Sequence, residues 1–233
     1  MDGPRTARAL ARVELTRQIK DVARQHVARD GAPALSLRAV ARELEMSSSA
    51  VYRYFASRDE LLTALIIDAY DSIGQAAEKA DARHDGATPR ARWITVGTAI
   101  RRWAVRNPHE YALVYGSPVP GYAAPQDTIA HAGRTINVLA TILGDAWAAG
   151  DITAPATAPP IPDGLRDDAL AAAEALSPGI PPEGVLAAIV AWSGLFGLVS
   201  FELFGQYENV INHRPAFFEL GLAHLGTVLG FPP

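Results

Sequence analysis

Apolar residues recur every three or four positions along most of the chain, and the strict alternation typical of β-strands is rare. The first spacing places apolar side chains on one side of a helix, where they can pack against a core. Glycine and proline interrupt the pattern repeatedly and mark helix ends. The pattern therefore predicts an all-α protein with about nine or ten helices. The predicted segments are 13–29, 37–44, 48–54, 57–79, 89–106, 108–115, 125–149, 165–176, 181–207 and 214–229.

Four of these segments lie close together near the N-terminus and carry clear start and stop signals. Asp30-Gly31 ends the first helix, and Ser36 is placed to cap the second. Glu45-Met46-Ser47 forms a tight turn before the third. Ser57 followed by Glu60 has the spacing of a capping box, in which each residue satisfies a backbone amide near the helix start.

Charge is distributed unevenly between the two ends of the chain. The 233 residues have a formal net charge of -4, but residues 1–60 carry +3 and the remainder carries -7. A basic module on an acidic body is compatible with nucleic-acid binding, which depends on neutralising phosphates. A solvated charged surface would give the same numbers, so charge alone leaves both interpretations open.

Two short helices joined by a three-residue turn form a helix-turn-helix pattern over residues 36–62. Ala41 is small enough to let the helices cross, and Met46 fills the turn. The second helix then presents its N-terminal side chains outward, where they can reach base edges and phosphates. A capped helical hairpin with exposed serines remains the alternative. The outward side chains are Ser47, Ser48, Ser49, Ala50, Tyr52 and Arg53.

The run LRAVARELEMSSSAVYRYFASRDELLTALI resembles the DNA-binding domain of TetR-family transcriptional regulators. The resemblance rests on the aromatic pair Tyr52 and Phe55, the basic Arg58 and the paired leucines that follow, and it spans about residues 13–70. Two departures are visible: Glu45-Met46 occupies a turn that usually contains glycine, and Arg58 replaces the usual lysine. The resemblance implies contacts with phosphates or bases for a set of ten residues. These are Ser36, Arg38, Ser47, Ser48, Ser49, Ala50, Tyr52, Arg53, Tyr54 and Arg58.

The rest of the chain is expected to form a larger helical domain that binds a ligand and dimerises. We expect a flexible arm at 1–11, a helix-turn-helix domain at 12–56, a connecting helix at 57–80 and the larger domain at 81–233. The stretch around Trp192-Ser193-Gly194 resembles a subset of the family with a Trp-His-Gly signature, with serine in place of histidine. Aromatic and polar side chains of this domain could line a cavity for a small, partly apolar ligand, or form plain core. They are Trp93, Arg101, Trp103, Tyr111, Tyr115, His131, Trp147 and Phe196.

Residues 184–201 include no charged side chain, which is long enough for a membrane span. Glu183 and Glu202 flank this run, and no cluster of Lys or Arg orients it, so we favour a buried helix. Burial by a second copy would produce a four-helix bundle with the last helix and make the protein a homodimer. The predicted interface residues are Ala191, Gly194, Gly197, Ser200, Phe217, Gly221 and Leu225.

Together these features predict a ligand-responsive regulator that binds a near-palindromic double-stranded DNA operator. The resemblance implies a repressor released by a small molecule. A membrane-associated helical protein and an enzyme with its active site in the C-terminal body are the alternatives, but no catalytic or cofactor motif is visible. We expect no metal and no cofactor, because the chain has no cysteine and its six histidines lack ligand spacing. A cytoplasmic location is expected, because no signal-peptide pattern opens the sequence.

Overall fold

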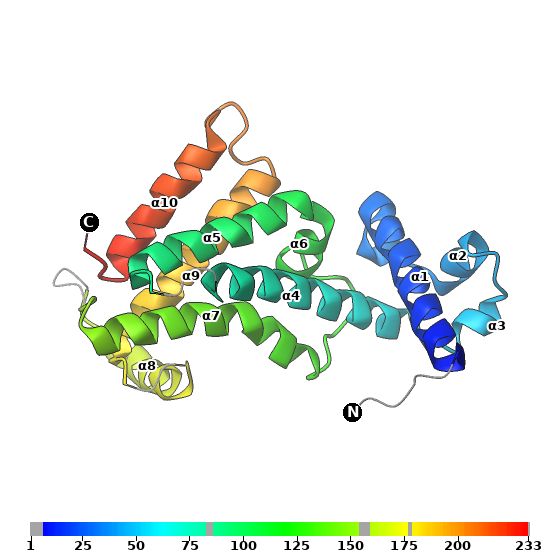
Figure 1. The fold of residues 1–233 in the computed structure, drawn as a ribbon, viewed down its shortest axis with the longest axis horizontal. Coiled ribbons are helices and arrows are strands. Elements are labelled where there is room, and N and C mark those ends of the chain that lie inside the picture. The colour runs from blue at the N-terminus through cyan, green and yellow to red at the C-terminus, as the bar shows by residue number, and fades with distance from the viewer. Residues whose placement is uncertain (1–6, 83–85, 154–158, 177–178, 233) are drawn as a thin grey trace. The chain divides into compact units, whose positions relative to one another are not determined.

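The computed structural model describes residues 7–82, 86–153, 159–176 and 179–232. Within these residues the chain forms ten α-helices and one short 3-10 helix, with no strand (Figure 1). Contacts divide the chain into two units. Unit 1 is Met1–Tyr70 with His109–His131, and unit 2 is Asp71–Pro108 with Ala132–Pro233.

Unit 1 contains the predicted helix-turn-helix. Its elements are α1 (Ala7–Asp30), η1 (Ala32–Ala34), α2 (Leu37–Glu43), α3 (Ser48–Val51), the first half of α4 (Arg58–Ala82) and α6 (Pro108–Tyr115). Ile19, Val40, Val51 and Leu61 are fully buried and form the centre of its core. Side chains of α6 and the loop after it pack against the same core, which extends the small module beyond the first seventy residues.

Unit 2 is built around the apolar helix α9. Its elements are the second half of α4, α5 (Pro89–Arg106), α7 (Thr128–Ala149), α8 (Asp163–Leu176), α9 (Pro182–Leu203) and α10 (Arg214–Val228). Helices α5, α8 and α10 all pack on α9. A Cβ atom at Gly194 would come within 2.6 Å of Leu225, and one at Gly221 within 2.6 Å of Leu198. These glycines therefore allow α9 and α10 to approach closely.

The helix-end signals correspond to real contacts. The Ser57 hydroxyl accepts a hydrogen bond from the Glu60 amide at 3.1 Å, as a capping box requires. The reciprocal bond goes one residue further back than expected, because the Glu60 carboxylate accepts from the Ala56 amide at 2.5 Å. Thr88 caps α5 through the Ala91 amide.

Several predicted boundaries were wrong. Helix α1 begins at Ala7, so residues 7–11 are helical and are not part of an arm; residues 1–6 of that arm lie outside the described residues. Helix α3 ends at Val51 rather than at residue 54, and the backbone continues in hydrogen-bonded turns. Helix α9 ends at Leu203 rather than near residue 207. By contacts the segment His109–His131 groups with unit 1, while the predicted division into domains at residues 56 and 80 stays a prediction.

The turn between α2 and α3 is a Schellman motif that contains no glycine. The Met46 amide donates to the Ala41 carbonyl at 2.9 Å, and the Glu45 amide donates to the Arg42 carbonyl at 3.2 Å. Glu45 therefore adopts a left-handed conformation, with φ of 54°. A side chain with a Cβ is strained in this region, and glycine is not.

We expect Glu45→Gly to raise the free energy of unfolding by about 1 kcal/mol, because glycine removes this left-handed strain. Denaturant unfolding of the variant measures the change. Asn209→Gly is the matched control: Asn209 also has a positive φ, 61°, but asparagine tolerates this region better. An equal or smaller gain for Glu45→Gly than for Asn209→Gly would contradict the assignment of strain to Glu45.

Candidate nucleic-acid interface and ligand cavity

In the helix-turn-helix, the residues predicted to face inward are buried and those predicted to face outward are exposed or partly exposed. Val40, Ala41, Val51 and Phe55 are buried, and Met46 packs partly against the same core. The predicted outward residues Ser47, Ser48, Ser49, Tyr52 and Arg53 are exposed, and Ala50 is partly exposed. The segment therefore presents short hydroxyl groups, one aromatic ring and one guanidinium to solvent.

Ser36 and Arg38 lie at the start of α2. Ser36 occupies the N-cap position, but its side chain makes no capping hydrogen bond. Its hydroxyl can thus donate to another group, and a phosphate oxygen beside the free amides of a helix start is a suitable acceptor. Arg38 is exposed on the first turn of the same helix.

Basic side chains of unit 1 fall into two groups. Members of the first group are bound to carboxylates of the same chain: Arg17, Lys20, Arg24, Arg29 and Arg58. Members of the second group are exposed and form no ion pair with any residue that the structure describes: Arg8, Arg12, Arg38, Arg42 and Arg53. The second group comes from the start of α1, from α2 and from the turn after α3. Three of its five members, Arg38, Arg42 and Arg53, belong to the helix-turn-helix, and Arg12 of α1 stacks on Tyr54 beside it.

The ion pairs of the first group also lower the pKa values of the carboxyl groups that take part in them. Hydrogen bonds from Arg17 and Gln18 lower the pKa of the Glu14 carboxyl to about 2. Hydrogen bonding to Arg29 likewise lowers the pKa of Asp30. Both carboxylates stay ionised at neutral pH and cancel the charge of their partners.

Two predicted phosphate contacts have other roles in the structure. Arg58 donates to the Ala32 carbonyl at 2.9 Å and to the Pro33 carbonyl at 3.4 Å, so its guanidinium ties α4 to the connection before α2. Tyr54 is half-buried against the core, and the Arg12 guanidinium stacks over its ring at 5.2 Å from the ring centre. The contact places Arg12 beside Tyr54, in the turn that follows α3. The sequence analysis did not single out Arg12, since its stacking partner lies 42 positions further along the chain.

A separate cavity of about 230 Å³ lies inside unit 2, between α5, α7 and α9. Its wall is aliphatic except for two tryptophans. The lining residues are Trp93, Ile136, Leu139, Ala140, Leu143, Ile180, Val185, Ala188, Ile189 and Trp192. A partly open apolar pocket between helices is a common place for a small molecule to bind.

Only one predicted ligand residue, Trp93, lines this cavity. Phe196 does not line the cavity, but the centre of its ring is 6.0 Å from that of Trp192. The others are placed elsewhere. Trp147 packs near Gly184, and Tyr111, Tyr115 and His131 belong to unit 1.

Two more of the predicted ligand residues are engaged in the structure of unit 2. Arg101 forms an ion pair with Glu202 at 2.6 Å, in which both side chains are largely buried. The Trp103 indole donates to the Ser72 hydroxyl at 2.8 Å. Most of the cavity wall was missed, because aliphatic residues on separate helices give no signal until the helices are packed.

The small residues predicted for a dimer interface are divided between two roles. Ala191 is fully buried in the chain's own core. Gly194 and Gly221 lie at the crossing of α9 with α10 and also line an open groove between these helices, so their contact with a second copy stays a prediction. No atom lies within 4 Å of a Cβ built at Gly197. Ser200, Phe217 and Leu225 are partly exposed.

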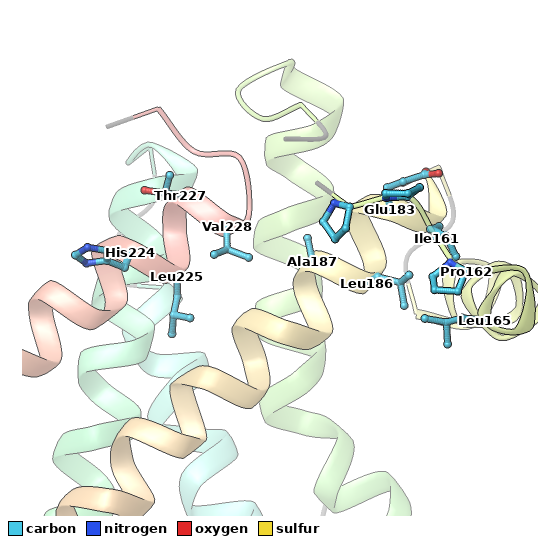
Figure 2. Close-up of a pocket in the computed structure, with 12 residues that line it drawn as sticks. Ile161, Pro162, Leu165, Glu183, Leu186, Ala187, His224, Leu225, Thr227 and Val228 are labelled. Atoms are coloured by element: carbon cyan, nitrogen blue, oxygen red, sulfur yellow. The ribbon is translucent and has the colours of Figure 1, made fainter. Parts of the chain in front are cut away.

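An apolar surface remains open on the same two helices, and we call it the α9–α10 face. It contains the exposed residues Val190, Phe201, Leu220 and Val228. A groove of about 380 Å³ between α9 and α10 shares His224 and Leu225 with a second groove of about 610 Å³. Figure 2 shows this second groove, with α10 residues on one side, Leu186 and Ala187 of α9 in the middle and the start of α8 opposite.

Helix α9 is the one helix among the described residues that is long and apolar enough to cross a membrane. Only 28% of its most apolar window is buried within the chain. The prediction that this helix is buried on all sides is therefore not met by a single copy.

Two family models match the chain. The model for bacterial regulatory proteins of the tetR family matches residues 19–65, and the model for a tetracyclin repressor-like C-terminal domain matches residues 93–225. The chain is 41% identical over 204 residues to an HTH-type transcriptional regulator of Mycobacterium tuberculosis, a match that covers 84% of each protein. A protein of the same description from Mycobacterium bovis matches equally well.

Solved structures of regulatory proteins also resemble this chain. The regulatory protein SCO4313 superposes with a TM-score of 0.75 at 37% identity, over 96% of this chain and 98% of that one. The TetR-family regulator PfmR from Thermus thermophilus shares the fold, with a TM-score of 0.57 at 18% identity over 93% of this chain and 100% of that one. The helix-turn-helix unit and the larger helical unit together define a DNA-binding transcriptional regulator. The chain belongs to the TetR family.

We expect Arg58→Ala to lower the free energy of unfolding by about 1–2 kcal/mol, because the two carbonyls that it satisfies lose a charged donor. Denaturant unfolding measures the loss. Arg53→Ala, an exposed arginine without a partner, should change stability by no more than about 0.5 kcal/mol. If Arg58→Ala were as stable as the unchanged protein, the guanidinium would be free for the phosphate contact that the sequence predicted.

Proposed function

We propose that this protein is a homodimeric repressor that binds a near-palindromic operator and is released from it by a small, partly apolar molecule. The observation that carries the proposal is the set of unpaired arginines on the helix-turn-helix face. In unit 1 the other cations that the structure describes are held by carboxylates, so these arginines alone remain to neutralise phosphates.

Their positions suggest distinct tasks. Arg38 and the Ser36 hydroxyl lie at a helix start and suit a phosphate. Arg53 follows the exposed serines and suits a guanine edge in the major groove, where arginine can bind two acceptors at once. Arg12, held over Tyr54, suits the flanking backbone. A dimer would present two such faces to successive major grooves about 34–36 Å apart.

The α9–α10 face supports a second copy as the partner. Apolar residues at 190, 194, 197 and 201 form one stripe along α9, since these positions recur at three- and four-residue spacing. The corresponding stripe on α10 runs through Phe217, Gly221, His224 and Val228. Two copies of this helix pair would form a four-helix bundle and cover the surface that a single chain leaves exposed.

The cavity in unit 2 supports control by a ligand. A molecule that binds one conformation of the protein more tightly than another shifts the population toward that conformation. Helices α4 and α7 each contribute residues to both units and link them covalently. DNA affinity would then fall by the difference in ligand affinity for the two conformations. We also propose that the protein acts in the cytoplasm and does not associate with a membrane. Its proposed activity is binding, not catalysis.

We expect Arg53→Ala to weaken binding to DNA selected from a random pool by about 1–3 kcal/mol and to relax the sequence preference at one position of each half-site. Arg38→Ala should weaken binding for all sequences and reduce the slope of log affinity against log salt by about 2 per dimer. Fluorescence anisotropy at several salt concentrations measures both effects.

Arg17→Ala is the matched control, because Arg17 is exposed but paired with Glu14 and Asp21. It should leave affinity and salt slope nearly unchanged. Equal losses for Arg17→Ala and Arg38→Ala would show that the unpaired arginines are not a distinct DNA-binding set. Absence of salt-sensitive binding to any selected DNA would contradict the proposed function as a whole.

We expect Val190→Glu and Leu220→Glu to convert a dimer into a monomer of 24.8 kDa, because each places a charge in the α9–α10 face. Light scattering after size exclusion measures the mass. Ile129→Glu, which lies in unit 1 and is 67% exposed, should remain dimeric. A monomeric unchanged protein, or dimeric charged variants, would place the contact elsewhere.

A further inference from the structure

A polar groove in unit 2, between α4 and α5, has no part in the proposed function, and we call it the α4–α5 groove. Its volume is about 730 Å³. Lys79 of α4 and Arg102 and Arg106 of α5 line it, and no acidic side chain is among its described lining residues. The groove is therefore positively charged, although residues 61–233 carry a net charge of -7.

None of these three cations forms an ion pair with a residue that the structure describes. Lys79 and Arg106 lie in the last turn of their helices, where positive charge is favourable by itself. Arg102 lies one turn earlier, four residues from Arg106, and like charges at this spacing repel each other. An anion in the groove would remove that repulsion. Carboxylates already neutralise other arginines of the unit, which are Arg92, Arg101, Arg134 and Arg214.

Contacts beside both ends of the α4–α5 groove hold its two helices together. The Trp103 indole donates to the Ser72 hydroxyl at 2.8 Å near one end. The Arg92 guanidinium pairs with Asp81 at 2.7 Å near the other. Residue numbers rise along α4 as they fall along α5 between these contacts, so the helices are antiparallel. The groove is therefore part of the fold and is present without a ligand.

The positive side chains of the groove are directed toward its middle. In the antiparallel arrangement Gln75 lies opposite the part of α5 around Ala99. The Lys79 ammonium donates to the Gln75 side-chain oxygen at 2.9 Å, so it reaches back by one turn to this level. Arg106 also reaches back, since its Nε donates to the Arg102 carbonyl at 3.1 Å. Long side chains on a helix lean toward its N-terminus, which directs Arg102 the same way.

Uncharged polar groups of the groove also present donors. The Ser72 hydroxyl oxygen accepts the Trp103 indole proton, so its own proton can be donated to another acceptor. The Gln75 side-chain oxygen accepts from Lys79, which leaves the amide N–H groups to donate. Ile94 and several alanines supply an apolar part of the wall. A complementary molecule thus carries negative charge, several acceptor oxygens and an apolar part.

A phosphate monoester meets these requirements better than a carboxylate does. At neutral pH its charge is about -1.5 to -2 and it has three terminal oxygens, whereas a carboxylate has one charge and two oxygens. Arginine can bind two phosphate oxygens at once, and lysine binds phosphate as a point charge. A wall of one charge sign also concentrates ions of the opposite sign in a cleft.

We propose that the α4–α5 groove binds a small phosphate monoester, with Lys79, Arg102 and Arg106 around its phosphate and Ile94 against its apolar part. The groove is separate from the apolar pocket between α5, α7 and α9, and the two share no lining residue. The inference goes beyond the proposed function and does not depend on it. It adds a second ligand site of opposite chemical preference to the same unit.

Three probes that share one aromatic ring test the assignment: phenyl phosphate, benzoate and benzyl alcohol. The full-length protein with ¹⁵N-labelled tryptophan is titrated at low salt without DNA, and NMR follows the indole signals. Trp103 lies on the groove wall, so its signal should shift. We expect phenyl phosphate to bind at least about tenfold more tightly than benzoate, because one further hydrogen bond to a charged group is worth that factor. Benzyl alcohol should not bind measurably.

Arg102→Gln should weaken binding of phenyl phosphate about tenfold or more, and Arg102→Lys should lose less, because it keeps the charge. Arg90→Gln is the matched control: Arg90 is an exposed arginine of the same helix that does not line the groove. It should leave the affinity unchanged. Equal affinity of phenyl phosphate and benzyl alcohol, undiminished binding by Arg102→Gln, or an equal loss for Arg90→Gln would each overturn the inference.

Arginines of the helix-turn-helix also attract phosphate, so a further variant separates the two surfaces. Arg38→Ala should leave the phenyl phosphate affinity and the Trp103 shift unchanged. A loss for Arg38→Ala in place of Arg102→Gln would place the probe on the DNA-binding surface and contradict the assignment. Arg102→Gln should in turn leave DNA affinity and its salt slope unchanged; a fall in both would make the groove a DNA contact and overturn the inference.

Failure of this inference and failure of the proposed function give different results. The groove is tested by probe titration without DNA, and the proposed function is tested by salt-sensitive binding of the ligand-free protein to DNA. A protein that binds DNA but not phenyl phosphate retains the proposed function and loses the groove assignment. A protein that binds phenyl phosphate through Arg102 but binds no DNA does the reverse.

Discussion

The uncharged helix α9 is the constraint on which unit 2 depends. An eighteen-residue stretch without charge must be covered in water, because exposing so much apolar surface costs free energy in proportion to its area. Helix α10 covers one side of it at glycine-mediated contact distance, and α5 and α8 cover others. The incomplete coverage leaves the two features on which the proposed function draws: an apolar pocket against α5 and α7, and an open apolar face.

In unit 1 the pairing of charges determines which basic side chains remain available to bind a polyanion. Its basic residues would be a weak argument for DNA binding if they were spread evenly over the surface. Instead, carboxylates of α1 and α4 pair with one set of cations, as in the contact of Lys20 and Arg24 with Asp68. Most of the arginines without an ion-pair partner, Arg38, Arg42 and Arg53, belong to the helix-turn-helix. Short-range ion pairing thereby turns a modest net charge into a localised positive surface.

Sequence reasoning succeeded where the signal was local. The helix-turn-helix, the capping box at Ser57 and the start of α5 at Thr88 depend on residues within four positions of one another, so pattern and structure agree. It did not foresee that Arg58 binds carbonyls 25 and 26 residues away. It also missed the cavity wall, where aliphatic residues of α7 and α9 lie together with Trp93 of α5. Too many aromatic residues were predicted to contact a ligand, because large aromatic side chains are also buried in an ordinary core.

The amino-acid sequence by itself determined the all-α fold class, the position of the helix-turn-helix and the family, because helix periodicity and turn chemistry act over a few residues. Only the tertiary structure decided which arginines are free, which glycines are used within the chain and which cations line the α4–α5 groove. Each of these depends on what a distant segment brings to within hydrogen-bonding or van der Waals distance. A linear pattern does not contain that information, since packing alone chooses the neighbours.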